Sequence, residues 1–368
     1  MINVIDRSKI DIFLILSIFF LFSMGIVFLY SATDMRATSY QFESQIIKFT
    51  MGMFLIIAIS HINPVLVKNL TPKFYLIVMI LLVLVPFTGT KILGAKRWLD
   101  LYIIQLQPSE LVKIALPAMI AFIVSRIGAL NSVRKLSLVL FFILVPTAFI
   151  ISQPDLGTTL LIIAPASIVI LCSGLTMRFL LSALFFGISV SIISFKYLIK
   201  DYQMKRIETL FNPESDPMGS GYHIIQSKIA IGSGGFNGKG FMEGTQSQLS
   251  FIPEQSTDFI LAVFLEETGF LGFLALSIGF FMLIGRMVYM TSQIQDIYAK
   301  LFSISITSSL FIYFFVNIGM VIGILPVVGV PLPFFSYGGS SMLTNMICIG
   351  LVMNFYKNRN LYQKQTII

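Results

Sequence analysis

Runs of about 20 consecutive apolar residues recur along this chain, and they constrain its fold more than any other feature. A hydrocarbon core about 30 Å thick requires helices of that length, because every backbone polar group inside it must be paired within the segment. Hydrophobic residues make up 56% of the 368 positions and charged residues 11%. A water-soluble domain could not solvate such a surface, and the runs lack the two-residue alternation of a membrane β-barrel. The sequence therefore predicts an all-α polytopic membrane protein, with 1–368 as a single integral membrane domain.

These runs predict about ten transmembrane helices, joined by short loops and by one long segment, 200–256. The predicted helix ranges are 10–31, 46–62, 73–88, 109–126, 136–152, 157–175, 178–199, 257–289, 299–325 and 336–356. An even number of spans places both termini on the same side of the membrane. Lysine and arginine concentrate in the segments on that side and are sparse in the short loops opposite. By the positive-inside rule both termini are cytoplasmic, so the long segment lies outside.

Four of the helices that would enter from the outside begin with the same signal, a proline followed by polar residues. The signals are Pro108-Ser109-Glu110, Pro154-Asp155, Pro253-Glu254, and Pro331 with Pro333 before Ser336 and Tyr337. Proline suits the first turn of a helix and an acid there meets the positive end of its dipole, so capping alone explains any one case. Their coincidence on one face favours a functional site there, with Asp155, Ser336 and Tyr337 among its candidates.

Asp258 is the strongest candidate for chemistry, because it stands where the long outer segment meets an apolar helix that also contains Glu266 and Glu267. Acidic residues in a membrane helix are costly and indicate function by default. Glu266 would share the side of Asp258, whereas Glu267 would point away. A carboxylate at the place of Asp258 can act as a general base toward a substrate at the membrane surface. The alternative is structural, a first-turn acid that is stabilised by the helix dipole.

The helix that follows Asp258 is longer than the membrane requires. Residues 257–289 would extend about 50 Å, against a hydrocarbon core of about 30 Å. The helix must therefore tilt, break near Gly269 or Gly272, or begin in a water-filled cavity. We favour the cavity, which would keep Asp258 and Glu266 hydrated on one side of the helix.

Two further sets of charged residues indicate a polar, phosphate-bearing ligand. Lys96 and Arg97 form a basic pair before Trp98 in an outer loop, and arginine binds phosphate oxygens in a bidentate manner. Interfacial snorkelling, with Trp98 as a belt aromatic, is the alternative. Glu110 and Lys113 lie three positions apart at the start of a predicted helix, so they can pair. Because a charged pair facing lipid would be costly, we expect them to face a polar cavity, with purely structural pairing as the alternative.

The long outer segment contains IGSGGFNGKG at 231–240, which invites comparison with nucleotide-binding loops. It fails the P-loop pattern because Ser233 stands at the first glycine position and Gly240 at the serine or threonine position. It fails the dinucleotide pattern as well, since Asn237 occupies the third glycine position. We expect a flexible loop that folds over a polar substrate, with a merely mobile loop as the alternative.

The two cysteines and two histidines are too dispersed to indicate a disulfide framework or a zinc site. The residues alone therefore assign no metal ligands. The net charge of +8 suits contact with anionic membrane lipid, and we expect no nucleic-acid partner.

Several long blocks along the chain form a specific combination. The blocks are GAKRWLDL at 94–101, QPSELVKIALP at 107–117, QPDLGTTL at 153–160, NPESDPMGSGYHIIQSKIAIGSGG at 212–235, GKGFMEGTQSQLSFIPEQSTDFI at 238–260, EETGFLG at 266–272 and GILPVVGVPLPFFSYGGSS at 323–341. With these blocks in this order, nearly the whole chain resembles the SEDS family (shape, elongation, division and sporulation). The PESDP and GTQSQ segments make it look closest to the elongation branch of that family.

The resemblance implies a ten-helix SEDS-type fold that polymerises lipid II into glycan strands at the outer face of the bacterial cytoplasmic membrane. It implies a class B penicillin-binding protein as the partner transpeptidase, and a divalent cation, Mg²⁺ or Mn²⁺, as cofactor. The family's proposed catalytic aspartate falls on Asp258. Its basic loop motif and its helix-four acid and lysine fall on Lys96, Arg97, Trp98, Glu110 and Lys113.

Two other classes of protein fit ten helices with intramembrane charges: a flippase for the lipid-linked precursor, and a scaffold that only holds partners. A flippase needs polar residues along the full depth of the membrane, whereas the charges within the predicted helices here concentrate toward their outer ends. We therefore predict an inverting glycosyltransferase with Asp258 as general base. Its predicted substrate-binding residues are Lys96, Arg97, Trp98, Glu110, Lys113, Asp155, Glu266, Ser336 and Tyr337.

Overall fold

The computed structural model describes residues 10–33, 40–92, 95–100, 105–153, 155–175, 201–216, 219–249, 251–252 and 254–360. Its helices are α1 (Ile12–Ala32), α2 (Tyr40–Ser60), α3 (Pro64–Thr88), α4 (Pro108–Ile127), α5 (Val133–Ser152), α6 (Leu156–Cys172), α8 (Asp201–Phe211), α9 (Ser220–Gly234), α10 (Thr245–Gln248), α11 (Ile260–Gln293), α12 (Ile297–Val321) and α13 (Gly339–Lys357). A short 3-10 helix, Pro213–Ser215, joins α8 to α9. The predicted helix at 178–199 lies outside the described residues.

The all-α membrane fold predicted from the apolar runs is confirmed. Within the described ranges, six helices are long and apolar enough to cross a membrane, namely α1, α2, α3, α5, α11 and α12. α4 and α13 differ from them, because most of their residues are buried against other helices, whereas α2, α3 and α5 each bury one narrow face. A helix inside the bundle meets protein instead of lipid, so it can carry polar side chains. The candidates on α4, Glu110 and Lys113, are therefore buried against other helices and do not face lipid.

Two helices begin well before their predicted starts, α2 at Tyr40 instead of 46 and α3 at Pro64 instead of 73. Pro72 lies inside α3, where the sequence suggested a boundary because proline lacks the amide donor that a helix interior uses. The start of α3 is fixed instead by Asn63, whose side chain accepts a hydrogen bond from Val65 N at 2.9 Å. Pro64 then occupies the first turn, where its missing donor costs nothing.

A three-stranded antiparallel sheet lies between α3 and α4 along the chain. Its strands, in the order β1-β2-β3, are β1 (Thr90–Ile92), β2 (Ala95–Asp100) and β3 (Gln105–Leu106). The basic pair Lys96-Arg97 and Trp98 are therefore part of a strand, β2, and not of a free loop. Pairing with both neighbours fixes the alternating directions of these side chains.

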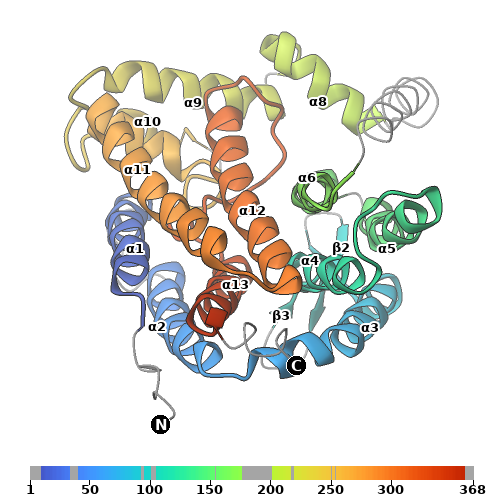
Figure 1. Cartoon of the computed structure of the whole chain (residues 1–368). Coiled ribbons are helices and arrows are strands. Elements are labelled where there is room, and N and C mark those ends of the chain that lie inside the picture. Colours follow the sequence, from blue (N-terminus) through green and yellow to red (C-terminus); the bar gives the residue numbers. More distant parts are fainter. Residues whose placement is uncertain are drawn as a thin grey trace.

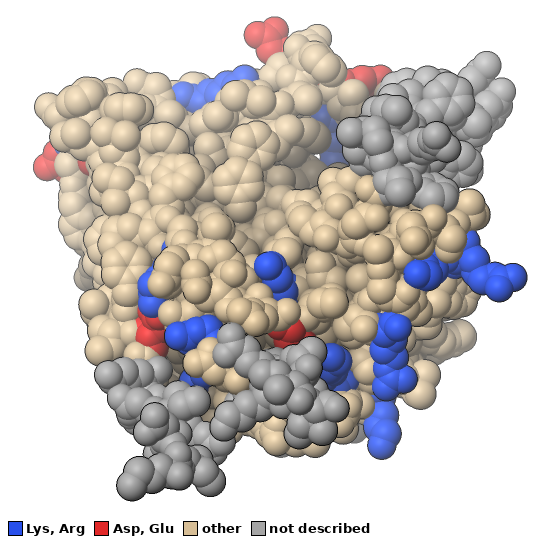
Figure 2. Space-filling view, viewed as in Figure 1, with Lys and Arg blue, Asp and Glu red and all other residues tan. Residues whose placement is uncertain are grey.

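The segment 200–256 is largely helical, because α8, α9 and α10 all lie within it. In Figure 1 these three helices lie along the upper edge of the molecule, and α9 packs against both α11 and α12. Figure 2 shows lysine and arginine gathered mainly in the lower half of the same view, away from that edge. The segment is thus a folded layer on one end of the bundle.

α11 is broken at Gly269, which has the non-helical angles φ 65° and ψ −157°. The 34 residues of α11 are therefore two helical segments, and the break that the sequence placed near Gly269 or Gly272 explains its excess length. The favoured explanation, a start in a water-filled cavity that hydrates Glu266, is wrong. Glycine is required at the break, because only it adopts this backbone conformation without strain.

The break leaves main-chain groups of α11 without helical partners, and residues 235–240 provide those partners. Four hydrogen bonds of 3.0 to 3.2 Å join Lys239 N to Glu266 O, Gly240 N to Glu267 O, Phe270 N to Gly235 O, and Leu271 N to Phe236 O. We call residues 235–240 the α11 clamp. The glycine-rich stretch is thus a fixed part of the helix packing, and the expectation of a flexible loop over a substrate is wrong for it.

Candidate active site

Asp258 lies in the turn that leads into α11, and its carboxylate is partly buried. Its Oδ2 is so near Gly329 that a Cβ built on that glycine would lie 3.3 Å from it. Gly329 belongs to the connection between α12 and α13, where it has a positive φ of 73°. The main-chain oxygen of Asp258 accepts a hydrogen bond of 3.1 Å from Asn317 Nδ2 on α12. Two separate elements therefore define the position of this residue.

The pKa of Asp258 is raised from 3.8 to about 6, and burial is the largest cause. The negative charge of Glu254 on the same turn contributes to this rise, and the guanidinium of Arg206 on α8 opposes it. A carboxylate with a pKa of about 6 is still mostly ionised at neutral pH, and it is a better proton acceptor than an ordinary aspartate.

The structural alternative for Asp258, a first-turn acid on the helix dipole, does not match the geometry. α11 begins at Ile260, and Phe259 occupies the N-cap position without a side-chain capping hydrogen bond. The first turn of α11 contains no acidic residue. The carboxylate of Asp258 is thus available for chemistry instead of for capping.

Arg97 and Asp155 are brought together from two different elements. Arg97 Nη1 of β2 lies 3.8 Å from Asp155 Oδ2, and Arg97 Nε donates to Gln153 O at 3.1 Å. Asp155 is also the N-cap of α6, where its side chain accepts from Thr158 N at 3.2 Å. Lys96 is exposed and donates to Pro86 O at 3.2 Å. The basic pair is therefore divided, with Arg97 ordered against an acid and Lys96 directed elsewhere.

Glu110 and Lys113 form the ion pair that their spacing predicted. Lys113 Nζ lies 2.5 Å from Glu110 Oε1, and both side chains are buried. The ammonium group also lies 4.7 Å from the centre of the Tyr313 ring on α12, a cation–π contact. Glu110 Oε2 and the Tyr313 hydroxyl are buried without a hydrogen-bond partner among the described residues. Unsatisfied buried polar atoms are rare and indicate a place for water or a polar ligand.

Ser336 and Tyr337 lie in the turn before α13. Ser336 is buried, and its Oγ accepts from Leu332 N at 2.8 Å, so the hydroxyl stabilises its own turn. Tyr337 N donates to Ser256 O at 3.0 Å, which ties this turn to the turn that carries Asp258. The ammonium group of Lys48 lies 5.2 Å from the centre of the Tyr337 ring.

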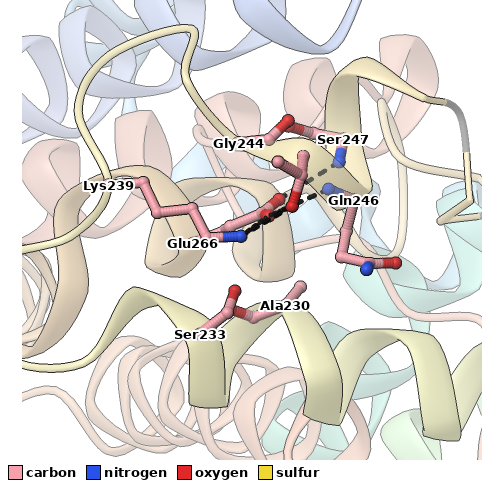
Figure 3. A network of polar contacts seen from close by, with 8 residues as sticks. Ala230, Ser233, Lys239, Gly244, Gln246, Ser247 and Glu266 are labelled. Atoms are coloured by element: carbon pink, nitrogen blue, oxygen red, sulfur yellow. Dashed lines mark hydrogen bonds and ion pairs between the residues drawn. The ribbon is translucent and has the colours of Figure 1, made fainter.

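Glu266 is completely buried and fully paired (Figure 3). Its carboxylate lies 2.7 Å from Lys239 Nζ and accepts from Gln246 N at 2.9 Å and Ser247 N at 3.1 Å. These partners lie on the α11 clamp and α10, so Glu266 holds this part of the outer layer on α11. Glu267 accepts from Met242 N at 3.1 Å and from the Ser31 hydroxyl. Both glutamates are buried and paired with protein groups, so both have a structural role here.

Comparisons with known proteins show the family of this chain. A family model described as cell cycle protein, covering FtsW, RodA and SpoVE, matches residues 10–361. The chain belongs to this family. The SEDS membership indicated by the sequence blocks is thereby confirmed.

Named relatives come from several bacteria. The peptidoglycan glycosyltransferase MrdB of Escherichia coli K12 is 44% identical over 322 residues, which are 88% of this chain and 87% of the relative. The peptidoglycan glycosyltransferase RodA of Treponema pallidum is 30% identical, over 94% of this chain and 97% of the relative.

Solved structures of the family share the fold. A chain from a peptidoglycan synthase complex that coordinates polymerization and crosslinking has a TM-score of 0.83 and 29% identity, covering 96% of this chain and 99% of its own length. The crystal structure of RodA from Thermus thermophilus has a TM-score of 0.72 and 25% identity, covering 96% and 98%.

In this SEDS chain, the sequence did not predict a role in the site for several residues near Asp258, among them Asn317, Arg206 and His223. The His223 ring stacks on Phe259 at 5.3 Å, and its Nδ1 is buried without a partner in the described parts. Burial lowers the pKa of His223 from 6.5, against the raising effect of Glu254 and Asp216. Asn317 had a usable signal, since an amide inside an apolar helix is costly. Arg206 and His223 lie in a polar segment, where no pattern distinguishes them.

Among the described residues, no cluster of three or more potential metal ligands marks a site for the divalent cation that the family resemblance implies. Within them, no three His, Cys, Asp or Glu side chains lie close enough to hold a metal ion. Mg²⁺ commonly binds through one or two carboxylates together with phosphate oxygens of a substrate.

Proposed function

We propose that this chain is a peptidoglycan glycosyltransferase that polymerises lipid II into glycan strands at the outer face of the bacterial cytoplasmic membrane during cell elongation. The observation that carries the proposal is Asp258, a partly buried carboxylate with a raised pKa and no capping role, in a chain 44% identical to a peptidoglycan glycosyltransferase. Such a group has the position and the proton affinity of a general base.

The reaction is a single displacement. Asp258 accepts the proton from the 4-hydroxyl group of the acceptor GlcNAc as that oxygen forms a bond to C1 of the donor MurNAc. The bond between C1 and the diphosphate oxygen breaks, and undecaprenyl diphosphate leaves with the electron pair. Attack from the opposite side inverts C1. One base suffices for this route, whereas a retaining glycosidase needs a second carboxylate as nucleophile.

The leaving diphosphate carries negative charge that the site must stabilise. Arg97 on β2 supplies an ordered positive charge, and the Glu110–Lys113 pair with Tyr313 supplies buried polar groups. Lys96 adds a second positive charge only if its exposed ammonium group turns from Pro86 O toward the diphosphate. Asp155 orients the guanidinium of Arg97. A divalent cation remains part of the proposal as a charge-neutralising group brought with the diphosphate, and no step is assigned to it.

The setting of the enzyme follows from the same proposal. The positive-inside rule supports cytoplasmic termini and an outer position for 200–256. The domain organisation is that of a single membrane domain with this segment as its outer layer. A class B penicillin-binding protein is the partner that would crosslink the product, which agrees with the relative that belongs to a peptidoglycan synthase complex.

Polymerisation by the purified full-length chain tests the activity directly. Lipid II is supplied in detergent or vesicles together with the partner transpeptidase blocked by a β-lactam, and the glycan strands are resolved on a gel. The proposal predicts strands that require this chain. The flippase alternative predicts none, and instead predicts transport of labelled lipid II across a vesicle membrane.

A further inference from the structure

Asn317 is completely buried on α12, and one amide group on its side chain joins two separate segments. Its Nδ2 donates to the main-chain oxygen of Asp258 at 3.1 Å and to that of Val330 at 2.6 Å. Val330 follows Gly329, the residue against which the Asp258 carboxylate lies. A single amide group therefore holds both the turn that carries the carboxylate and the loop that forms its wall.

The turn that carries Asp258 is held by two main-chain hydrogen bonds of its own, from Thr257 N and Phe259 N to Glu254 O, and by contacts with other elements. It precedes α11 and is not part of the helical hydrogen-bond ladder. Glu254 at its start has a positive φ of 51°, a strained conformation for a residue other than glycine. Tyr337 N ties Ser256 O on the same turn to the α12–α13 connection. Without Asn317, the carbonyl groups of Asp258 and Val330 would lose this donor, which would loosen the turn against the loop at Gly329.

We propose that Asn317 is a positioning residue for the reaction, which holds the carboxylate of Asp258 against Gly329 in the orientation needed for proton transfer. This inference rests on the proposed role of Asp258 as general base. Catalysis is sensitive to such placement, because a shift of about 1 Å in a reacting group can reduce the rate by about 10²-fold.

The charges that face Asp258 predict an effect on its titration as well. They are Glu254 on its own turn and Arg206 on α8, and His223 on α9 lies behind Phe259. Burial is the largest cause of the raised pKa of Asp258. Loosening the turn admits water to the carboxylate, so its pKa should fall toward the ordinary value.

Asn354 on α13 provides a matched control. It is also completely buried, and its Nδ2 donates to two main-chain oxygens, those of Ile59 at 2.8 Å and Ile62 at 2.6 Å. These contacts join α13 to the end of α2, away from Asp258. Replacing either asparagine by leucine removes two hydrogen bonds from Nδ2 to main-chain oxygens, and at Asn354 also a long one of 3.4 Å that its Oδ1 accepts from Asn358 Nδ2. The general cost of losing a buried amide should therefore be at least as large at Asn354.

The experiment compares Asn317→Leu, Asn354→Leu and Asp258→Asn in the full-length chain with lipid II as substrate, with rates expressed per folded enzyme. Asn317→Leu should lower kcat by about tenfold or more with KM nearly unchanged, and should shift the acidic limb of the pH profile to lower pH. Asn317→Ser keeps one hydrogen-bond donor, so it should lower kcat and shift the acidic limb in the same directions but by smaller amounts. This variant replaces Asn317→Leu in the experiment if the leucine variant does not fold.

The outcomes separate the two claims. If Asn317→Leu or Asn317→Ser has the kcat and pH profile of Asn354→Leu while Asp258→Asn is inactive, Asn317 is merely structural and the inference is overturned. If Asp258→Asn polymerises lipid II at the wild-type rate, the proposed function of Asp258 fails and the inference fails with it.

Discussion

The guanidinium of Arg97 and the carboxylate of Asp155 meet with Nη1 and Oδ2 3.8 Å apart, one from strand β2 and the other from the N-cap of α6. The two residues are 58 positions apart (155 minus 97) in the sequence, where each was a candidate on its own. Their contact orders the arginine without burying it, since about a third of its side chain (32%) remains exposed. An ordered and accessible arginine is suited to bind a diphosphate from outside.

Arg97→Ala should reduce kcat/KM for lipid II strongly. A charge-assisted contact is worth about 1.5–3 kcal/mol, which corresponds to roughly a ten- to hundredfold loss. Arg134→Ala is the control, because Arg134 is an exposed arginine at the start of α5 with no place in the site. If Arg97→Ala and Arg134→Ala have the same kcat/KM, Arg97 does not bind the substrate and has only an interfacial role.

The α11 clamp predicts opposite effects for two glycines of the same helix. Gly269→Ala places a Cβ 2.3 Å from Gly238 N at a positive φ of 65°, so it should destabilise the protein. Gly285→Ala meets nothing within 4 Å and should be neutral or stabilising by up to about 1 kcal/mol, because alanine favours a helix. Thermal unfolding in detergent measures both. A Gly269→Ala protein as stable as Gly285→Ala would argue against the clamp.

The membrane orientation can be tested with two exposed asparagines, Asn237 in the α11 clamp and Asn131 before α5. In a background without Cys172 and Cys348, Asn237→Cys should react with an impermeant thiol reagent added to intact spheroplasts, because the clamp belongs to the outer layer. Asn131→Cys should react only after the membrane is opened. The reverse pattern would place the site in the cytoplasm and exclude the proposed reaction there.

The pH dependence of polymerisation should report Asp258. A general base acts in its ionised form, so activity should be present above the pKa of about 6 and be lost as the pH falls through it. An ordinary aspartate, with a pKa of 3.8, would keep its activity to much lower pH. Circular dichroism at each pH checks that the fold persists. A rate that stays constant down to about pH 4 would contradict a raised pKa at the base.

The membrane helices and part of the site could be predicted from the sequence, because the interactions that determine them involve residues close together in the chain. Apolar runs determine the membrane helices, and the spacing of three residues on one helix is enough to pair Glu110 with Lys113. The cost of placing an acid beside a membrane helix marked Asp258.

Long-range packing explains what the sequence did not reveal. Glu266 is neutralised by Lys239, which is 27 residues away, and no local pattern predicts that contact. Asn317 reaches Asp258 across 59 residues. The glycine-rich sequence of 235–240 predicted a flexible loop. In the folded chain its main-chain groups form hydrogen bonds with the break in α11, and no local sequence pattern indicates those contacts.

The substitution Asp258→Asn tests the central claim most directly. It keeps the size and the main-chain hydrogen bond to Asn317, and removes the ability to take a proton. Membrane insertion and binding of the partner should persist, because Asp258 does not cap α11. Polymerisation of lipid II by the purified protein should fall by at least about 10²-fold, the lower bound for a positioned general base. A folded, partner-bound Asp258→Asn protein that still polymerises lipid II at a near wild-type rate would contradict the general-base mechanism.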